Sequence, residues 1–383
     1  AHQVKGQDWT KRFIDRVVCR ADDPLEILAY YLAVYGKPLP NALKKGLGSA
    51  LARFEAYQLA KYRRESASLK LVDAVNLVHP PHTEALAALM NGSLKPANTW
   101  ETKLTQAGQS AESDQDKSEK KAEAWTDLVR SRKIGYFALL RNLRNILEQA
   151  PDLIDDVRQL LVDETLIRKS LVLPFRFLTA LDALETSGLR NADKLMASIS
   201  DAVDISLANV PRFEGRTLVA VDTSGSMSGK PIKIASLFAS VLYKANDAEV
   251  ILFSNSAEYA TFNKRDTTLT IAKSIQDKAN YGGTDFHAIF KKARAGYDRI
   301  IILSDMQAWV GYYTPAKTFA AYRKRTGDSP KVFTFDLAGY GTLQFPEKDV
   351  YALAGFSDKT MDTLRFLEED KSALLRQIET IEL

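Results

Sequence analysis

The feature that most constrains the fold of this chain is an alternation, after residue 214, of short apolar runs with segments of helical periodicity. A continuous apolar run such as residues 216–221 is typical of a strand buried in a parallel sheet. Strands that alternate with helices predict a doubly wound α/β sheet. The expected strands are residues 216–221, 250–253, 299–303, 331–335 and 350–353, and the expected helices are residues 230–246, 267–279, 285–295 and 315–326.

Three short polar pieces end or face the apolar runs of this region. They are Asp222-Thr223-Ser224-Gly225-Ser226, Gly282-Gly283-Thr284-Asp285 and Leu303-Ser304-Asp305. Ligands of doubly wound sheets bind outside the carboxyl ends of the strands, where we expect these pieces to meet. Two carboxylates and three hydroxyls are hard oxygen ligands that suit Mg²⁺ or a similar divalent cation. The pieces therefore predict a binding surface rather than a reaction centre, although a D-x-S-x-S turn can also be a helix cap.

The first half of the chain has a different pattern. Residues 8–213 show helical periodicity and almost no strand pattern, and helices of ten to fifteen residues with short breaks favour an α-solenoid of stacked hairpins. The expected helices are residues 24–35, 40–49, 51–62, 69–77, 83–91, 125–131, 134–148, 151–161 and 173–186. The polar stretch 105–124 is predicted to be a flexible loop or an exposed helix start. We therefore expect a helical module over residues 1–213 and an α/β domain over residues 214–383.

Composition limits the compartment and the class of protein. The chain has 383 residues, 45% of them hydrophobic, and a formal net charge of +4. Its single cysteine excludes an intrachain disulfide and fits a reducing compartment. No apolar run approaches the roughly 20 residues that a membrane span needs, and residues 1–8 hold no signal-peptide core. We expect a cytoplasmic protein without membrane contact.

The positive charge is concentrated in two segments. Residues 41–70 hold seven basic and two acidic residues, and residues 130–145 hold five basic and no acidic ones. Local basic patches on a nearly neutral protein indicate a polyanion site. Two alternatives stay open: the first segment can be a solvated helix face, and Arg141 and Arg144, three residues apart, can pair with Asp155 and Asp156.

The polar pieces of the second half resemble the metal-ion-dependent adhesion site of von Willebrand factor A domains, whose motif is D-x-S-x-S followed by T and D. The resemblance implies that Ser224, Ser226 and Thr284 ligate the metal through hydroxyls, some by way of water. It also implies that Asp222 and Asp305 hold the metal directly or through water. The cofactor implied is Mg²⁺ or another divalent cation.

The helical half is similar to the TROVE module of the Ro autoantigen family. The similar pieces are residues 28–32, 39–46, 59–63, 77–80, 137–146 and 173–181, and residues 355–358 match the tail of the family's A domain. The order of the parts, helical module first and A domain last, also matches. The resemblance implies a short member of bacterial or phage type, with HEAT-like helical repeats forming a ring or partial ring followed by a von Willebrand factor A-like domain.

The family resemblance implies a non-enzymatic RNA-binding protein. Members bind small noncoding Y RNA on a basic outer face, and single-stranded ends of misfolded RNA enter the ring. They act as scaffolds in RNA quality control or processing. The implied partners are a small noncoding RNA and an exoribonuclease or other RNA-processing protein, with the chain a monomer apart from RNA. The candidate RNA-binding residues are Lys45, Lys61, Arg63, Arg64, His79, Arg141 and Arg144.

Motifs of common enzyme classes are absent from the sequence. It contains no Walker A motif, no G-x-S-x-G elbow, no H-E-x-x-H and no C-x-x-C. We expect no enzymatic activity. The main alternative is a protein-interaction module that captures an acidic partner through the divalent metal. Metal-dependent phosphoryl or nuclease chemistry is a third reading, but no general base is evident.

Overall fold

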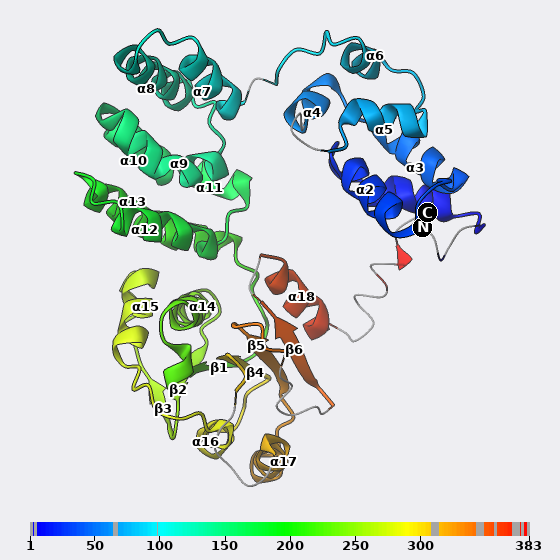
Figure 1. The fold of residues 1–383 in the computed structure, drawn as a ribbon. Helices are drawn as coiled ribbons and strands as arrows, with labels where there is room; N and C mark the ends of the chain where they lie inside the picture. Colours follow the sequence, from blue (N-terminus) through cyan, green and yellow to red (C-terminus); the bar gives the residue numbers. More distant parts are fainter. Residues whose placement is uncertain are drawn as a thin grey trace. The chain divides into compact units, whose positions relative to one another are not determined.

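The computed structural model describes residues 3, 6–63, 68–97, 99–307, 314–341, 348–355, 358–369, 376 and 379–380. Figure 1 shows the helices and strands of the chain, which divides into two compact units after residue 124, within α8 (Asp114–Arg130). The first comprises residues 1–124 with 379–383, and the second comprises residues 125–378. Each is described by itself.

The first unit is helical. Its helices are α1 (Thr10–Val17), α2 (Asp23–Tyr35), α3 (Asn41–Ala52), α4 (Ala56–Lys61), α5 (Leu71–Val78), α6 (Glu84–Met90), α7 (Trp100–Gln109) and the first part of α8 (Asp114–Arg130). α1 packs closely on α3 because Gly46 has no side chain. A Cβ atom at that position would lie 2.7 Å from Cβ of Ile14 and 2.8 Å from the carbonyl oxygen of Lys11. The core of this unit is built from aliphatic side chains such as Leu28, Leu43 and Leu47.

Helices α7 and α8 decide between the two alternatives for residues 105–124: the stretch is an exposed helical region and not a flexible loop. Most of that stretch is helical, interrupted only between Gln109 and Asp114. The helix is stabilised by local polar pairs four residues apart, in which Lys120 Nζ lies 2.8 Å from Asp116 and Gln115 Nε2 lies 3.1 Å from Glu119. These pairs stabilise a helix whose surface is mostly solvated, so apolar periodicity alone could not reveal it.

The helical part of the second unit continues the hairpin pattern. It contains α9 (Tyr136–Gln149), α10 (Ile154–Leu161), α11 (Glu164–Ser170), α12 (Phe177–Glu185) and α13 (Ala192–Ser206). α12 packs on both α9 and α13, as expected for stacked helical pairs. The sequence did not single out α1, α11 or α13 as separate helices.

The second unit then forms a six-stranded sheet of strand order β3-β2-β1-β4-β5-β6. Its strands are β1 (Thr217–Asp222), β2 (Glu249–Phe253), β3 (Ala257–Ala260), β4 (Arg299–Ser304), β5 (Lys331–Asp336) and β6 (Val350–Ala354). Every pairing is parallel except that of β2 with β3, an antiparallel edge strand that the sequence did not predict. β1 and β4 are central, and the chain leaves them toward opposite edges of the sheet, so the topological switch point lies between them.

Helices cover both faces of this sheet. α14 (Lys230–Ala245), α15 (Thr268–Asp277) and α18 (Asp358–Glu369) pack on the face that includes Val219 and Val221. α16 (Phe286–Lys292) and α17 (Pro315–Thr326) pack on the face that includes Leu218 and Ala220. The expected fold class is therefore confirmed: helical repeats followed by a doubly wound α/β domain.

The helical and α/β parts of the second unit pack directly on each other. Asp204 of α13 lies 2.9 Å from Lys244 Nζ of α14 and accepts a 3.0 Å hydrogen bond from the backbone N–H of Thr268. The rings of Phe175 and Phe238 have centroids 5.4 Å apart. All-helical structure ends with the 3-10 helix Leu207–Asn209, whereas the compact units divide after residue 124. The division into domains 1–213 and 214–383 stays a prediction.

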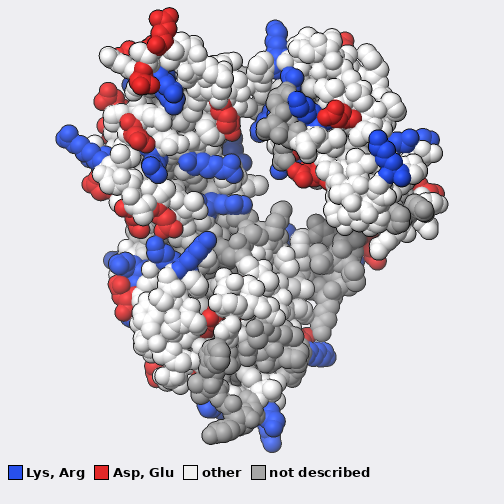
Figure 2. Space-filling view, in the orientation of Figure 1, with Lys and Arg blue, Asp and Glu red and all other residues white. Residues whose placement is uncertain are grey.

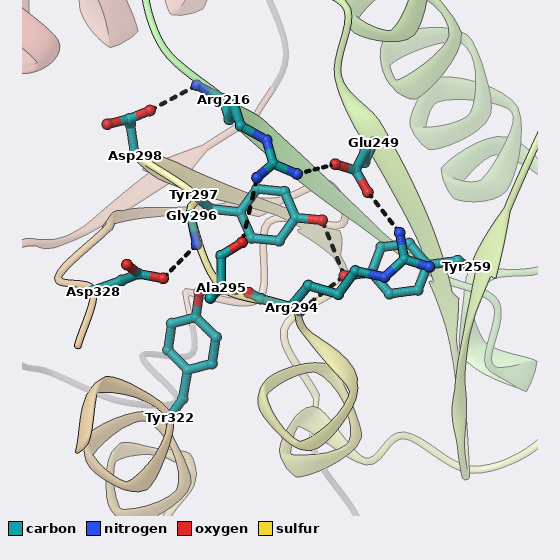
Figure 3. Close-up of polar contacts among 10 residues, drawn as sticks. All are labelled: Arg216, Glu249, Tyr259, Arg294, Ala295, Gly296, Tyr297, Asp298, Tyr322 and Asp328. Atoms are coloured by element: carbon teal, nitrogen blue, oxygen red, sulfur yellow. Dashed lines mark hydrogen bonds and ion pairs between the residues drawn. The ribbon is translucent and has the colours of Figure 1, made fainter. Parts of the chain in front are cut away.

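A polar network joins the starts of the central strands, at the edge opposite the switch point (Figure 3). Arg216 Nη2 lies 2.5 Å from one oxygen of Glu249, and Arg294 Nη1 lies 3.3 Å from the other. The two guanidinium groups lie over the rings of Tyr297 and Tyr259, whose hydroxyl oxygens are 3.0 Å apart (Figure 3). This network ties β1, β2, β3 and the loop before β4 together.

Candidate functional site

Two buried aspartates lie at the switch point of the sheet. Asp222 is the last residue of β1, and Asp305 directly follows β4. Asp222 Oδ1 accepts a 2.9 Å hydrogen bond from the backbone N–H of Ser224, and Asp222 Oδ2 accepts a 2.6 Å bond from the Ser304 hydroxyl. The hydroxyl oxygens of Ser224 and Ser226 are 3.2 Å apart. Two of the three predicted polar pieces therefore meet, as expected from the parallel sheet.

Backbone hydrogen bonds bring the third piece to the same place. Gly225 donates to the carbonyl of Gly282 at 2.9 Å, and Tyr281 donates to the carbonyl of Thr223 at 2.9 Å. The approach is close, because a Cβ atom on Gly225 would lie 3.3 Å from the carbonyl oxygen of Tyr281. Thr284 follows in this loop and is buried. All five predicted metal ligands thus belong to loops that contact one another at one edge of the sheet.

The helix-cap alternative does not describe the D-x-S-x-S turn. α14 begins at Lys230 with Gly229 as its N-cap residue, so the turn ends before that position. The short 3-10 helix Gly225–Met227 follows Ser224, whose side chain makes no capping hydrogen bond. Asp285 does act as a cap: its carboxylate accepts a 2.9 Å bond from the backbone N–H of His287 at the start of α16.

The electrostatics of the two aspartates favour a cation between the loops. Burial raises the pKa of Asp222 to about 6, and the negative charge of Asp305 adds to the rise, while hydrogen bonds from Ser224 and Ser304 oppose it. Asp305 Oδ2 is buried, and within the described part of the chain no group donates a hydrogen bond to it. A buried carboxylate oxygen without a partner is costly unless a ligand satisfies it.

The donor set fits Mg²⁺ because it consists of carboxylates and hydroxyls alone. Across the residues that the structure describes, no group of three or more His, Cys, Asp or Glu side chains could hold a metal ion. The site at Asp222 and Asp305 has only two carboxylates, so a cation here would depend on Ser224, Ser226, Thr284 and water for its remaining ligands.

The candidate RNA-binding residues of the first unit lie at its surface. Lys45 on α3, Lys61 at the end of α4 and Arg63 just after it are exposed. His79 is also exposed and takes the left-handed position after α5, with φ of 49°, where its backbone N–H closes the helix on the carbonyl of Val75. Arg64 lies outside the described residues.

Arg141 and Arg144 of the second unit line a groove of about 650 Å³. The structure adds three cations to them: Arg176 from the 3-10 helix Pro174–Arg176, and Lys230 and Lys233 from the first turn of α14. Phe137 and Leu178 contribute apolar surface, and Asp182 is the one acidic side chain in the lining. Lys233 Nζ lies 3.0 Å from Asp182 and 3.9 Å from Glu185.

The alternative role of Arg141 and Arg144, pairing with Asp155 and Asp156, is not what the structure contains. Asp155 lies 3.2 Å from Arg158, and Asp156 lies 3.2 Å from Arg130. Within the described ranges, Arg141 and Arg144 form no ion pair, and both are exposed. Figure 2 shows Lys and Arg side chains gathered over the stacked helices of this unit and next to α14. The groove therefore combines the guanidinium groups of Arg141 and Arg144 with three further cationic side chains, those of Arg176, Lys230 and Lys233.

Sequence reasoning missed Arg176, Lys230 and Lys233. Arg176 stands alone in its segment, and Lys230 and Lys233 are only a pair, so none of them belongs to a larger basic cluster along the chain. The available signal was the i, i+3 spacing of Lys230 and Lys233, which places both on one face of a helix start.

Comparisons with known proteins agree with this architecture. The TROVE domain family matches residues 93–227, and the Ro60 vWA domain family matches residues 216–366. RNA-binding protein RO60 of Deinococcus radiodurans is 23% identical over an alignment 178 residues long, which covers 43% of this chain and 33% of that protein. The aligned part thus spans a third of that relative's length.

A solved structure extends the similarity of fold to almost the whole chain. The crystal structure of the Deinococcus radiodurans RO (RSR) protein has a TM-score of 0.74 at 18% identity, covering 95% of this chain and 85% of that one. The two family matches occur in the order TROVE then vWA and together run from residue 93 to residue 366, so the chain belongs to the Ro family. No helix in the described part of the chain is long and apolar enough to span a membrane.

Proposed function

We propose that this protein is a non-enzymatic RNA-binding protein that holds small noncoding, Y-like RNA and single-stranded RNA ends as a scaffold for RNA quality control or processing. The observation that carries the proposal is the groove of the second unit, which gathers Arg141, Arg144, Arg176, Lys230 and Lys233 around a single acidic side chain. Membership of the Ro family and the similarity to a protein named RNA-binding protein RO60 support it.

The chemistry of the groove suits a phosphate backbone. Lys and Arg side chains neutralise phosphates and release counterions, which gives affinity that falls as salt rises. Arginine can also bind phosphate with two parallel hydrogen bonds. Phe137 and Leu178 give the groove apolar surface against which an unpaired base can pack. A small noncoding RNA is thus the proposed partner of the groove. From the family resemblance we further propose an exoribonuclease or other RNA-processing protein as a partner, with the chain cytoplasmic and monomeric apart from RNA.

Charge reversal in the groove tests the proposal. The double variant Arg141→Glu with Arg144→Glu is compared with Lys264→Glu and Lys273→Glu, which makes the same change of net charge at two exposed lysines outside the groove. Binding of a fluorescent hairpin RNA with a single-stranded 3′ tail is measured by anisotropy at several salt concentrations. We expect the groove variant to lose about tenfold or more in affinity and to lower the salt slope by roughly 0.7–0.9 per lost contact.

Two outcomes decide the matter. If both double variants bind alike, net charge rather than the groove governs the interaction, and the site is wrong. If the wild-type protein does not bind the RNA at all, the proposed function is wrong.

We also propose a second function, capture of an acidic partner through a divalent cation. It is favoured by the buried Oδ2 of Asp305, which lacks a partner among the described residues. Asp222, Ser224, Ser226, Thr284 and Asp305 would hold Mg²⁺, and the bound cation would offer a free coordination position to an outside carboxylate. Calorimetric titration with MgCl₂ tests the site: Asp222→Ala is expected to abolish the binding heat, whereas Ser228→Ala, an exposed serine of the same loop, keeps it. Equal heats in both variants would refute the site.

A further inference from the structure

A separate cluster in the first unit combines two tyrosine rings with two cations. It consists of Arg20, Tyr57, Lys61 and Tyr62, and we call it the tyrosine–cation stack. The guanidinium carbon of Arg20 lies 5.0 Å from the ring centroid of Tyr62. Lys61 Nζ lies 5.4 Å from the centroid of Tyr62 and 5.9 Å from that of Tyr57. Cations and rings therefore alternate along the surface, in the order Arg20, Tyr62, Lys61, Tyr57.

The inner end of the stack is held firmly. Arg20 Nε donates to Asp22 Oδ1 at 2.9 Å, and a second Arg20 nitrogen donates to the other oxygen of Asp22, a buried residue. The backbone N–H groups of Cys19 and Arg20 both donate to Asp23 at the start of α2. The loop between α1 and α2 thus places the Arg20 side chain before any ligand arrives.

The outer end of the stack is also placed by its helix. Tyr57 and Lys61 are four residues apart on α4 and therefore lie on one face of it. The buried Leu59 anchors the helix, and reciprocal hydrogen bonds of Glu55 and Gln58 close its first turn. Both ends of the stack are fixed during folding, so a ligand does not bear the full entropic cost of ordering these side chains.

The outermost ring remains open. Tyr57 keeps 50% of its surface exposed, although it belongs to an ordered cluster. Lys61 is exposed and has no carboxylate partner in the part of the chain that the structure describes. A single exposed tyrosine is common at protein surfaces, so the open ring of Tyr57 would not indicate a ligand by itself. An open ring next to an unpaired ammonium group, however, matches a nucleotide, whose base stacks on the ring while its phosphate meets the cation.

We propose that Tyr57 is a stacking site for an unpaired base of RNA, next to the phosphate that Lys61, already a candidate RNA-binding residue, would hold. This inference rests on the proposed RNA-binding function and adds to it a preference for unpaired nucleotides over continuous duplex. An acidic peptide would engage Lys61 and Arg20 but would gain nothing from the open ring, so the ring favours RNA. The stack lies in the first unit, so its contribution can be removed without touching the groove of the second unit.

The test uses the full chain and two hairpin RNAs with the same stem. One carries 2-aminopurine in a single-nucleotide bulge, and the other carries it within a fully paired stem. Tyr57→Leu removes the ring, Tyr57→Phe keeps it, and Tyr30→Leu removes another exposed tyrosine of the same unit, on α2. Anisotropy gives the affinities, 2-aminopurine fluorescence reports stacking, and circular dichroism verifies folding.

We expect Tyr57→Leu to weaken binding of the bulged RNA by about five- to hundredfold and to lose the fluorescence change, with the paired RNA unaffected. Tyr57→Phe and Tyr30→Leu should behave like the wild type. If Tyr57→Leu binds the bulged RNA as tightly as the wild type, or loses both RNAs equally, the stacking site is refuted while the proposed function stands. If the wild-type chain binds neither RNA, the proposed function itself fails.

Discussion

Asp305 places a carboxylate oxygen in a buried position where none of the described residues donates a hydrogen bond to it. Its other oxygen accepts a 3.3 Å bond from the backbone N–H of Gln307, at the outer limit of useful length. Asp222 is buried close enough for the charge of Asp305 to raise its pKa. Without a cation, the switch point therefore holds two buried carboxyl groups, and the described residues compensate them only in part.

This arrangement predicts the effect of neutralising one carboxylate. In EDTA, Asp305→Asn should raise the melting temperature of the second unit, because it removes the repulsion between two buried carboxylates; a gain of about 1 kcal/mol would appear as about 2–4 °C. The same variant should lose the stabilisation that Mg²⁺ gives to the wild type. Differential scanning fluorimetry with EDTA and with MgCl₂ measures both effects.

Asp336 provides the matched control. It is also a buried aspartate at a strand end, but its carboxylate accepts hydrogen bonds from the backbone N–H groups of Ala338, Gly339 and Gly341. Asp336→Asn should therefore lower the melting temperature. A lower melting temperature for Asp305→Asn in EDTA, with an unchanged response to Mg²⁺, would contradict the metal site.

The meeting of the candidate metal ligands at one edge of the sheet was predictable from the sequence, whereas most of the groove was not. Asp222, Ser224 and Ser226 follow a recognisable strand within five residues, and Thr284 and Asp305 occupy corresponding places after other elements. The groove instead takes its cations from α9, the 3-10 helix before α12 and the start of α14. Single charges that meet only through tertiary packing leave no pattern along the chain.

At the scale of the secondary-structure elements, the polar network at the starts of β1, β2 and β4 depends on the carboxylate of Glu249. Glu249 at the beginning of β2 accepts from both Arg216 and Arg294, while each guanidinium also lies over a tyrosine ring (Figure 3). Glu249 and Arg216 hold each other's pKa values away from their usual range, lowering that of the acid and raising that of the base. The pair is partly exposed, so solvent screens much of this interaction.

Removing that carboxylate should loosen the network. Glu249→Ala is expected to cost about 1 kcal/mol of unfolding free energy, since two guanidinium groups lose a partner at a partly exposed site. Urea denaturation measures the loss. Asp277→Ala, which removes an exposed partner of Lys273 on α15, should change the unfolding free energy by less than about 0.5 kcal/mol. Equal losses of unfolding free energy in the two variants would mean that the network stabilises the protein no more than an exposed ion pair does.

Elements with apolar periodicity were predictable, and those without it were not. β1, β2, β4, β5 and β6 appeared as apolar runs, because both faces of a parallel sheet are buried. The edge strand β3 has the sequence Ala-Glu-Tyr-Ala, which contains no apolar run. Its extended conformation depends on its pairing with β2. α7 and α8 depend on polar pairs between charged and amide side chains, and a composition rich in Gln, Ser, Glu and Lys is equally typical of loops.

For the whole molecule, the division into two compact units predicts local effects of core substitutions. A methyl group at Gly46 would overlap Ile14 and the backbone of Lys11, so Gly46→Ala should cost about 1–3 kcal/mol. Hydrogen exchange measured by mass spectrometry should show faster exchange in α1 and α3 and unchanged exchange in β1 and α14.

Gly108 is the matched control in the same unit. It lies in the last turn of α7, where an added Cβ would meet only the ends of two flexible side chains, Lys121 at 3.7 Å and Lys117 at 3.8 Å. Gly108→Ala should therefore slow exchange locally, because alanine stabilises a helix interior by about 0.5–1 kcal/mol relative to glycine. Faster exchange in β1 and α14 of the Gly46 variant would show that the two units unfold together.

The packing of the helical repeats on the α/β domain affects which ligands the groove can bind. It rests on the contacts of Asp204 with Lys244 and Thr268, and on the contact of Phe175 with Phe238. They join the helical repeats to α14, so the distance between the arginines of α9 and the lysines of α14 is set when the unit folds. Cationic side chains held at fixed positions select a polyanion by the spacing of its negative groups rather than by their number. Polyanions whose spacing differs from that of these side chains, such as heparin fragments, should therefore compete less well than RNA of equal total charge.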